Sequence, residues 1–340
     1  MAQAPATSSS DDAPTFKVGT RKSPLALAQT DVVVQQLQQL FPKHAFPLHM
    51  MTTTGDRDQN TALYNFGGKG LWTSQLEELL VQGDVDLVVH SLKDMPTTLP
   101  HGCVLGCVTR RHDPRDTLVI KQSLMDTHGW KTLHDLPPGS VIGTSSVRRI
   151  AQLARRYPHL RFCDIRGNIH TRLRKLDDDA DMVAIILAAA GLQRMQLGHR
   201  ISQYLDNDSA GVLHAVGQGA LGVECRAADD RVLSALRQIQ HAETALACAA
   251  ERSLMRVLEG GCSVPIGVET SWTGTQLQLK ATVVSPSGAE AVDAEASGPV
   301  STTEAAEELG KRVAQELERG GADKILKAIN ATRSKDESKT

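Results

Sequence analysis

The sequence predicts an α/β protein with two α/β domains and a small α+β domain at its C-terminal end. With 340 residues, the chain is long enough for two or three domains. From residue 16 to about residue 216, apolar stretches typical of strands alternate with stretches of helical periodicity, which indicates largely parallel sheets. After residue 264, several strand-like stretches follow one another before two final helices, which indicates an α+β unit.

Composition narrows the class of protein further. Aromatic residues make up only 3% of the chain, so aliphatic side chains and alanine must fill the cores. The net charge of −2 provides no overall field for nucleic acid, and an anion site would require local clustering of Arg and Lys. No apolar run approaches the roughly 18 residues of a membrane-spanning helix, so no membrane partner is expected.

The first α/β unit begins with a strand that leads directly into a helix. Ser23 is expected to be the N-cap of that helix, with Pro24 at its first position, and Pro42 ends it. The expected elements are a strand at 16–20, a helix at 24–41, a strand at 46–52, a polar loop at 53–60, a helix at 71–82 and a strand at 86–89.

The second α/β unit follows a charged link at 110–116, interpreted as a crossover between domains. The elements expected around it are strands at 103–109, 117–121, 140–143, 160–165 and 182–187, a helix at 147–157, and a further helix that carries Arg194. Residues 144–146 can cap the helix that starts at Val147. Residues 122–139 are expected to be an irregular surface excursion, and 212–226 a return crossover and strand.

Two helices are expected at 229–240 and 242–258, and a Gly-rich loop leads from the second helix into strands between 264 and 296. Helices at about 302–319 and 321–330 close the chain. The expected organisation is a disordered tail at 1–15, a first domain formed by 16–113 and 217–240, a second at 114–216, a third at 241–330, and a polar tail at 331–340.

Arginines and lysines recur just past the ends of the predicted strands. The positions are Arg21, Lys69, Lys93, Arg148, Arg149, Arg166, Arg172 and Arg194. Each alone is typical of a solvated surface charge, but together they predict a cation-lined cleft between the two α/β domains that binds a polyanion. Arginine suits carboxylates through paired hydrogen bonds. Aromatic residues for base stacking are sparse in these loops, which argues against nucleic acid.

Two of these positions raise specific expectations. Arg148 and Arg149 lie in the first turn of a predicted helix, where positive charge is unfavourable, so we expect an anion beside them. Lys69 lies in a glycine-rich loop that lacks P-loop spacing, and that loop is either a flexible turn or an anion-binding segment.

The stretch after the strand at 86–89 is the candidate centre of the chemistry. Ser91, Lys93 and Asp94 follow a buried strand directly, and ligands of open α/β sheets bind beyond such strand ends. A carboxylate at this place is a candidate for chemistry on a charged substrate. The alternative is an ordinary polar turn after a core strand.

Cys262 lies in the glycine-rich loop rather than in a core element. It is either a small buried apolar side chain or a functional thiol, and no histidine nearby could activate it as a nucleophile, which leaves a covalent anchor. Cys103 and Cys107 are too far apart along one strand for a disulfide, and no second cysteine pair completes a metal site, so no metal is expected.

With these stretches identified, the sequence closely resembles the porphobilinogen deaminase (hydroxymethylbilane synthase) family. Six stretches match in the family order over about residues 16–330. They are Gly19-Thr20-Arg21-Lys22-Ser23-Pro24-Leu25-Ala26, Val89-His90-Ser91-Leu92-Lys93-Asp94-Met95-Pro96-Thr97, Gly143-Thr144-Ser145-Ser146-Val147-Arg148-Arg149, Ile165-Arg166-Gly167-Asn168-Ile169-His170-Thr171-Arg172, Gly217-Gln218-Gly219-Ala220-Leu221-Gly222-Val223-Glu224 and Glu259-Gly260-Gly261-Cys262-Ser263-Val264-Pro265.

The resemblance implies a three-domain fold in which the first two domains are similar to periplasmic binding proteins. It implies a transferase of tetrapyrrole and heme biosynthesis that joins four porphobilinogen molecules head to tail with loss of ammonia, after which water releases hydroxymethylbilane. It also implies a dipyrromethane cofactor, attached by a thioether to Cys262.

The resemblance further implies roles for individual residues, and Asp94 corresponds to the catalytic carboxylate. We also expect Asp94 to be the only carboxylate in the cleft. The residues implied to bind the cofactor are Cys262, Lys93, Ser91, Ser145, Ser146, Arg148, Arg149, Arg172 and Gly167. Those implied to bind substrate are Arg21, Ser23, Gln29, Arg166, Arg194, Lys69 and Trp72. Trp72 and His170 depart from the family pattern, which usually has Phe at the first position and often Asn at the second.

The expected partner is therefore porphobilinogen, bound by a cytoplasmic monomer. The scattered cysteines favour a reducing compartment. One alternative is a non-catalytic polycarboxylate binder with the same two-domain architecture, and another is a cysteine hydrolase using Cys262.

Overall fold

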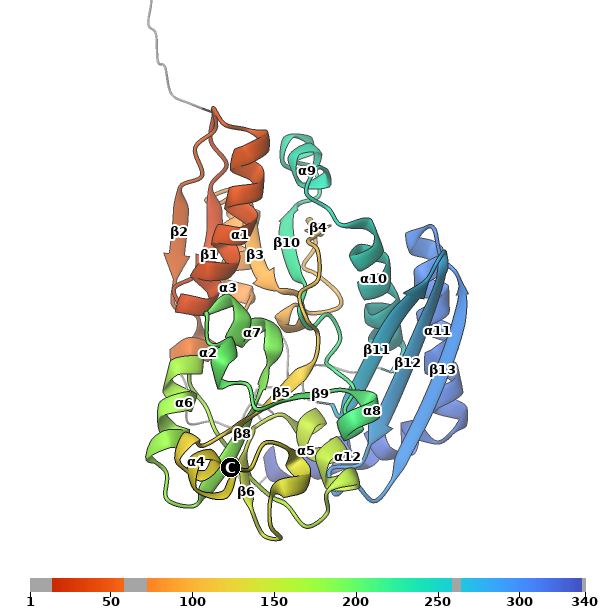
Figure 1. Cartoon of the computed structure of the whole chain (residues 1–340). Helices are drawn as coiled ribbons and strands as arrows, with labels where there is room; N and C mark the ends of the chain where they lie inside the picture. Colours follow the sequence, from red (N-terminus) through yellow and green to blue (C-terminus); the bar gives the residue numbers. More distant parts are fainter. Residues whose placement is uncertain (1–13, 58–71, 259–263, 338–340) are drawn as a thin grey trace, which may run out of the picture.

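The computed structural model describes residues 14–57, 72–258 and 264–337, arranged around three sheets (Figure 1). Residues 1–13 of the expected tail, Lys69, Cys262 and residues 338–340 lie outside the described residues, so the expectations for them are not addressed by the fold. The expected tail at 1–15 is too long, because Thr15 forms a β-bridge with Ala45. The predicted fold class is confirmed, because two sheets carry helices of an α/β arrangement and the C-terminal sheet is antiparallel.

The first sheet has the strand order β2-β1-β3-β10-β4. Its strands are β1 (Val18–Arg21), β2 (Leu48–Met51), β3 (Leu87–Ser91), β4 (Cys103–Val108) and β10 (Leu221–Arg226). β1 is parallel to β2 and β3, but β10 is antiparallel to both β3 and β4. The expectation of a largely parallel sheet therefore holds for the direction of β1, β2, β3 and β4. β10 is reversed, because the chain leaves after β4 and returns from the second sheet in the opposite direction.

Helices flank this first sheet. They are α1 (Pro24–Leu40), the short α2 (Thr54–Arg57), α3 (Ser74–Gln82) and α9 (Asp230–Arg237), and the 3-10 turn η2 (Leu92–Asp94) follows β3. The side chain of Ser23 caps α1 as expected, by accepting a hydrogen bond from the Ala26 N–H at 3.3 Å. The polar stretch expected to be a loop from residue 53 instead forms α2 over its first residues.

The second sheet has the order β7-β6-β8-β5-β9. Its strands are β5 (Asp116–Ile120), β6 (Val141–Gly143), β7 (Arg161–Cys163), β8 (Met182–Ala188) and β9 (Gln203–Leu205). β6 is parallel to β7 and β8, whereas β5 is antiparallel to β8 and β9, so this sheet is mixed as well.

The helices of the second unit are α4 (Gln122–His128), α5 (Val147–Arg156), α6 (Ile169–Asp178), α7 (Ala189–Arg194) and α8 (Asn207–Ala210), with 3-10 turns η3 (Leu133–Asp135) and η4 (Gly198–Arg200). The surface excursion expected to be irregular contains α4 and η3, and Leu133 of η3 is fully buried in the core. Ser146 precedes α5 without a capping hydrogen bond from its side chain. Ser145 instead bonds through its hydroxyl to the backbone of Ile165 at 3.0 and 3.1 Å.

The third sheet is an antiparallel meander of β11 (Ile266–Thr273), β12 (Gln276–Val284) and β13 (Ala291–Pro299). α10 (Ala242–Val257) and α11 (Thr303–Arg319) pack against it and share its core, and α12 (Ala322–Glu337) extends past the residue 330 expected from the sequence. α10 also contacts the first sheet, since Cys248 shares a buried cluster with Val108 of β4 and with Leu92 and Met95 of the turn after β3. None of the helices in the described ranges is long and apolar enough to cross a membrane.

Candidate functional site

A cavity of about 720 Å³ lies where the loops of the two α/β units meet. Every predicted site residue within the described ranges lines it. From the first unit these are Arg21, Ser23, Gln29, Trp72, Ser91, Lys93 and Asp94, and from the second Ser145, Ser146, Arg148, Arg149, Arg166, Gly167, Arg172 and Arg194. The third unit contributes Met255, Val264 and Ile266, which lie on either side of the segment that contains Cys262.

Asp94 is positioned by the turn η2 at the carboxyl end of β3. Leu92 begins this turn and donates its N–H to the carbonyl of Ala220, which connects the turn to the strand β10. Gly217 approaches Leu92 so closely that an added Cβ would lie 2.9 Å from its Cγ, and its φ of +71° also favours glycine. The glycine in this stretch therefore allows the return crossover to pack directly on the Asp94 turn.

Ser91 and Lys93 lie on either side of Leu92 in the same loop. The hydroxyl of Ser91 accepts a hydrogen bond from Gln29 at 2.7 Å. The ammonium of Lys93 donates to Gln218 at 3.2 Å. The pKa of Lys93 is lowered to about 8, chiefly by burial, while Asp94 raises it and Arg149 lowers it.

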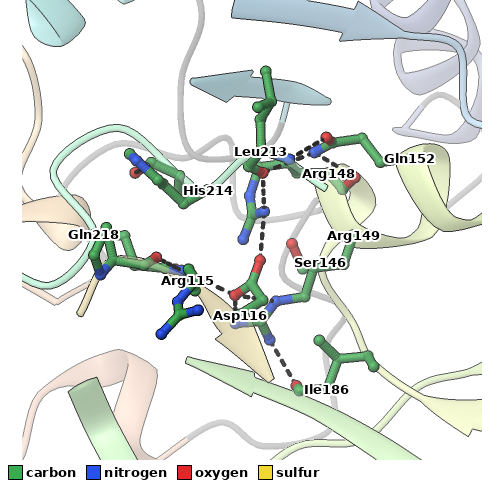
Figure 2. Close-up of polar contacts among 12 residues, drawn as sticks. Arg115, Asp116, Ser146, Arg148, Arg149, Gln152, Ile186, Leu213, His214 and Gln218 are labelled. Atoms are coloured by element: carbon green, nitrogen blue, oxygen red, sulfur yellow. Dashed lines mark hydrogen bonds and ion pairs between the residues drawn. The ribbon is translucent and has the colours of Figure 1, made fainter. Parts of the chain in front are cut away.

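Asp116 is the anion beside Arg148 and Arg149 (Figure 2). Its fully buried carboxylate accepts hydrogen bonds at 2.7 Å from each guanidinium and at 2.9 Å from Gln218. Although burial alone raises the pKa of Asp116, the two arginines hold it far below its usual range. The anion expected beside the start of α5 is thus the side chain of Asp116, which precedes Arg148 by 32 residues and Arg149 by 33.

Both arginines are also fixed to the backbone. Arg148 donates to the carbonyl of Leu213, and Arg149 donates to that of Ile186, each at 2.7 Å (Figure 2). Both residues still line the cavity, with side chains that are 6% and 8% exposed. Asp116 therefore holds two cations rigidly at its wall.

Arg166, Gly167 and Arg172 come from the turn into α6. Arg172 donates from Nε to the carbonyl of Gly167 at 2.7 Å, and Gly167 has a φ of +113° that favours glycine. Burial lowers the pKa of Arg172 to about 10, with Arg149 and Arg166 adding to the effect and Asp94 opposing it. Arg172 is therefore a buried cation with two further arginines nearby.

Arg194 ends α7 and donates to the carbonyl of Gly219 at 2.8 Å. Burial lowers its pKa to about 10. Within the part of the chain that the structure describes, its buried Nε has no hydrogen-bond partner. A buried guanidinium donor with this geometry suits an incoming anion.

Asp94 is not the only carboxylate in the cavity, contrary to the expectation from sequence. Asp56 of α2 also lines the wall and forms an ion pair with Arg21, with Nε of Arg21 3.1 Å from Oδ2. The guanidinium of Arg21 lies 4.1 Å from the centroid of the Trp72 ring. Asp56 follows the end of β2, the same place after a strand at which the cations were recognised, and this signal could have identified it.

Metal ligands do not cluster in the parts of the chain that the structure describes. No group of three or more His, Cys, Asp or Glu side chains there has an arrangement that could bind a metal ion. Cys103 and Cys107 are buried free thiols, and burial raises the pKa of each, to about 11 and about 12 respectively. The chemistry offered by the site is therefore that of a polycationic cavity containing two carboxylates.

Comparisons with known proteins agree over almost the full chain. The family model "Porphobilinogen deaminase, dipyromethane cofactor binding domain" matches residues 16–234, and "Porphobilinogen deaminase, C-terminal domain" matches residues 245–319. Relatives named porphobilinogen deaminase include one from Neurospora crassa, 51% identical over 96% of this chain and 97% of its own length. Another, from Yarrowia lipolytica, is 50% identical over 93% and 94%.

Among solved structures, similarity extends to a nutrient binding protein from Burkholderia cenocepacia bound to methionine. Its TM-score is 0.41 at 15% identity, covering 65% of this chain and 90% of that one.

Proposed function

This chain belongs to the porphobilinogen deaminase family, and we propose on that premise that the cavity described above is its active site and Asp94 its catalytic carboxylate. The enzyme joins four porphobilinogen molecules into hydroxymethylbilane in tetrapyrrole biosynthesis, with release of one ammonia per molecule added and with water releasing the product. This membership sets aside both alternatives considered from the sequence, the polycarboxylate binder and the cysteine hydrolase.

The observation that best supports this assignment is the charge of the cavity wall. Its cations are Arg21, Lys22, Lys93, Arg148, Arg149, Arg166, Arg172 and Arg194, whereas its lining carboxylates are Asp56 and Asp94. Porphobilinogen has an acetate and a propionate on each pyrrole, so the growing product gains two negative charges with every unit. Arginine donors at several points of one cavity match such a chain.

The same wall fits the family's dipyrromethane cofactor. The two pyrroles of this group bear four carboxylates, and the lowered pKa values of Lys93, Arg172 and Arg194 indicate cations that an added anion would stabilise. When bound, the cofactor supplies the nucleophilic pyrrole carbon to which the first substrate is joined. We propose that it is attached at Cys262 and held by Ser91, Lys93, Ser145, Ser146, Arg148, Arg149, Gly167 and Arg172.

Asp94 is proposed to act on the charge that develops during the reaction. As ammonia leaves, positive charge forms on the substrate pyrrole, and a fixed carboxylate close to the pyrrole N–H stabilises that charge and accepts or returns protons. The turn η2 fixes Asp94, and Lys93 and Arg172 lie near enough for Asp94 to affect their pKa values. The substrate carboxylates are proposed to bind to Arg21, Ser23, Gln29, Lys69, Arg166 and Arg194, with Trp72 beside them.

Substitution of Asp94 tests the assignment. We expect Asp94→Asn to lower kcat at least 100-fold with the thermal unfolding temperature unchanged, because the side chain keeps its size and loses its charge. The measurement is turnover of porphobilinogen by cofactor-loaded protein, with loading checked by intact mass at Cys262. Asp84→Asn, on an exposed residue after α3, is the matched control and should keep full activity. Substantial turnover by Asp94→Asn would remove Asp94 from its role.

The organisation of the molecule is part of the proposal. We propose a first domain of residues 16–113 and 217–240, a second of 114–216 and a third of 241–330, and the place of β10 within the first sheet supports the return of the chain to that domain. A cytoplasmic monomer is also proposed, and the free thiols at Cys103, Cys107, Cys163, Cys225 and Cys248 support a reducing compartment. Light scattering during gel filtration tests the monomer.

A further inference from the structure

We propose that Asp56 is an internal counter-ion that occupies Arg21, and that a substrate carboxylate must exchange with Asp56 to bind there. This inference rests on the proposed function, because it takes Arg21 as a site for a carboxylate of porphobilinogen. It adds Asp56 as a residue that lowers the affinity of Arg21 for a substrate carboxylate.

The geometry of the pair is that of a bound carboxylate ligand. Arg21 presents its Nε and Nη2 edge, with Nε 3.1 Å from Oδ2 of Asp56 and Nη2 paired with Oδ1. This edge is the one an external carboxylate uses for two parallel hydrogen bonds. Because both residues line the cavity, Asp56 and a substrate carboxylate compete for the same donors.

Trp72 fixes the position of the guanidinium group. Its ring lies 4.1 Å from Arg21 and packs so tightly on Gly55 that an added Cβ at Gly55 would come within 2.4 Å of the ring. Arg21 can therefore change partner without changing place, since stacking on an indole does not depend on which carboxylate it bonds.

Asp56 retains partners when Arg21 is taken from it. The backbone N–H of Thr53 donates to its Oδ2 at 3.2 Å, and the hydroxyl of Thr53 donates to the same atom at 2.8 Å. The side chains of Arg21 and Asp56 are 21% and 18% exposed, so water can also reach them. Although burial raises the pKa of Asp56, Arg21 and Thr53 lower it overall, so the group is ionised at neutral pH.

Comparison with Asp116 shows why this pair can exchange. Asp116 is fully buried in a strand, bonds to two arginines and cannot be reached from the cavity by a ligand without breaking the core. Asp56 lies on the four-residue α2, and its ion pair with Arg21 is at the partly exposed cavity wall. Substrate carboxylates must bind and leave as the product grows. A counter-ion that can be displaced, such as Asp56, allows this, whereas Asp116 does not.

Binding of succinate, a non-reacting dicarboxylate, to the holoenzyme tests the exchange. Trp130→Phe and Trp272→Phe leave Trp72 as the single fluorescent indole of the three in the chain. In this background, titration with succinate is followed by the fluorescence of Trp72. We expect Asp56→Asn to lower the succinate concentration at half-saturation about three- to tenfold, because the partly exposed carboxylate that competes for Arg21 is gone. The asparagine keeps the oxygen that Thr53 bonds.

Matched variants make the result specific to charge. Asp56→Glu keeps the carboxylate and should stay within about twofold of the parent, and Arg21→Gln with Asp56→Asn should abolish the gain. In steady state, Asp56→Asn should lower KM for porphobilinogen by a similar factor without raising kcat. Asp56→Ser replaces Asp56→Asn if the latter does not fold.

An unchanged or higher succinate midpoint in the folded Asp56 variant would overturn the inference, as would a gain that survives loss of Arg21. If the parent holoenzyme turns over porphobilinogen but the Asp56 variants show no gain in affinity for succinate, only the exchange is refuted. Parent holoenzyme that fails to turn over porphobilinogen refutes the proposed function itself.

Discussion

Cations in the cavity divide into those that pair with a buried carboxylate and those that hydrogen-bond to uncharged oxygens. Arg148 and Arg149 belong to the first kind, because Asp116 neutralises both from a fully buried position. Lys93, Arg172 and Arg194 belong to the second kind, and burial lowers the pKa of each. The two kinds predict different experimental behaviour, the first in stability and the second in ligand binding.

Replacing Asp116 tests the permanent pair. We expect Asp116→Asn to lower the free energy of unfolding by about 3–5 kcal/mol, because it leaves two buried guanidinium groups without their counter-ion. Chemical denaturation at pH 7 is the measurement. The matched control is Asp293→Asn, which breaks the exposed pair with Arg155 and should cost no more than about 1 kcal/mol. Equal losses in the two variants would contradict the account of Asp116.

The pKa of Lys93 predicts a change in binding at alkaline pH. Its lowered pKa of about 8 means that the ammonium form is present below that pH and is lost above it. In the holoenzyme, the carboxylates of the cofactor favour the ammonium form of Lys93 and raise the pH at which its proton is lost. We therefore expect kcat/KM for porphobilinogen to fall with rising pH, starting at or above pH 8.

Two variants separate Lys93 from other titrating groups. Lys93→Arg keeps its charge and should remove this step from a kcat/KM profile taken between pH 6.5 and 9.5. Lys22→Arg changes another lysine of the cavity wall and should keep the profile of the parent. A Lys93→Arg profile that still falls like that of the parent would assign the step to another group.

Helix α10 connects the third unit to the loop that carries Asp94. Arg252 of this helix is 6% exposed and donates to the carbonyl of Pro96 at 2.7 Å and to that of Met95 at 3.5 Å. The preceding residue, Glu251, pairs with Arg111 of the crossover at 2.6 Å. Adjacent residues of one helix thus fix both the turn that carries Asp94 and the link between the two α/β units.

We expect Arg252→Met to lower kcat about 10- to 100-fold with KM changed less than twofold, because release of the two carbonyls shifts Asp94 from its productive position. Turnover per cofactor-loaded molecule is the measurement. Arg256→Met is the matched control from the next turn of α10, where the side chain pairs with Glu307 instead. It should affect stability alone, and a similar loss of kcat in both variants would show that α10 acts only through folding.

Local patterns in the sequence predicted most of the elements and the cations, but not their partners. Ser23 could be identified as a cap because a cap depends on residues within one turn. Asp116 and Asp56 could not be assigned to Arg149 and Arg21 from sequence, because 33 and 35 residues separate the partners. Only the folded sheets bring them together.

Strand direction was also beyond the sequence. β5 and β10 have the apolar composition of buried strands, which is the same for both directions. Their antiparallel pairing follows from the two crossovers that join the sheets, near Arg111 and near Gly217, and tertiary contacts fix these crossovers. The sequence therefore predicted which residues form each sheet better than how the strands run.

The place of β10 between β3 and β4 has a consequence for biosynthesis. All strands of the second sheet have been synthesised once residue 205 is made, whereas the first sheet needs residues 221–226 to fill a gap in its middle. Units generally fold as they emerge during translation, earlier ones first. Here the order must be reversed, and the nascent N-terminal strands have to wait, with an open edge, until the later unit is complete.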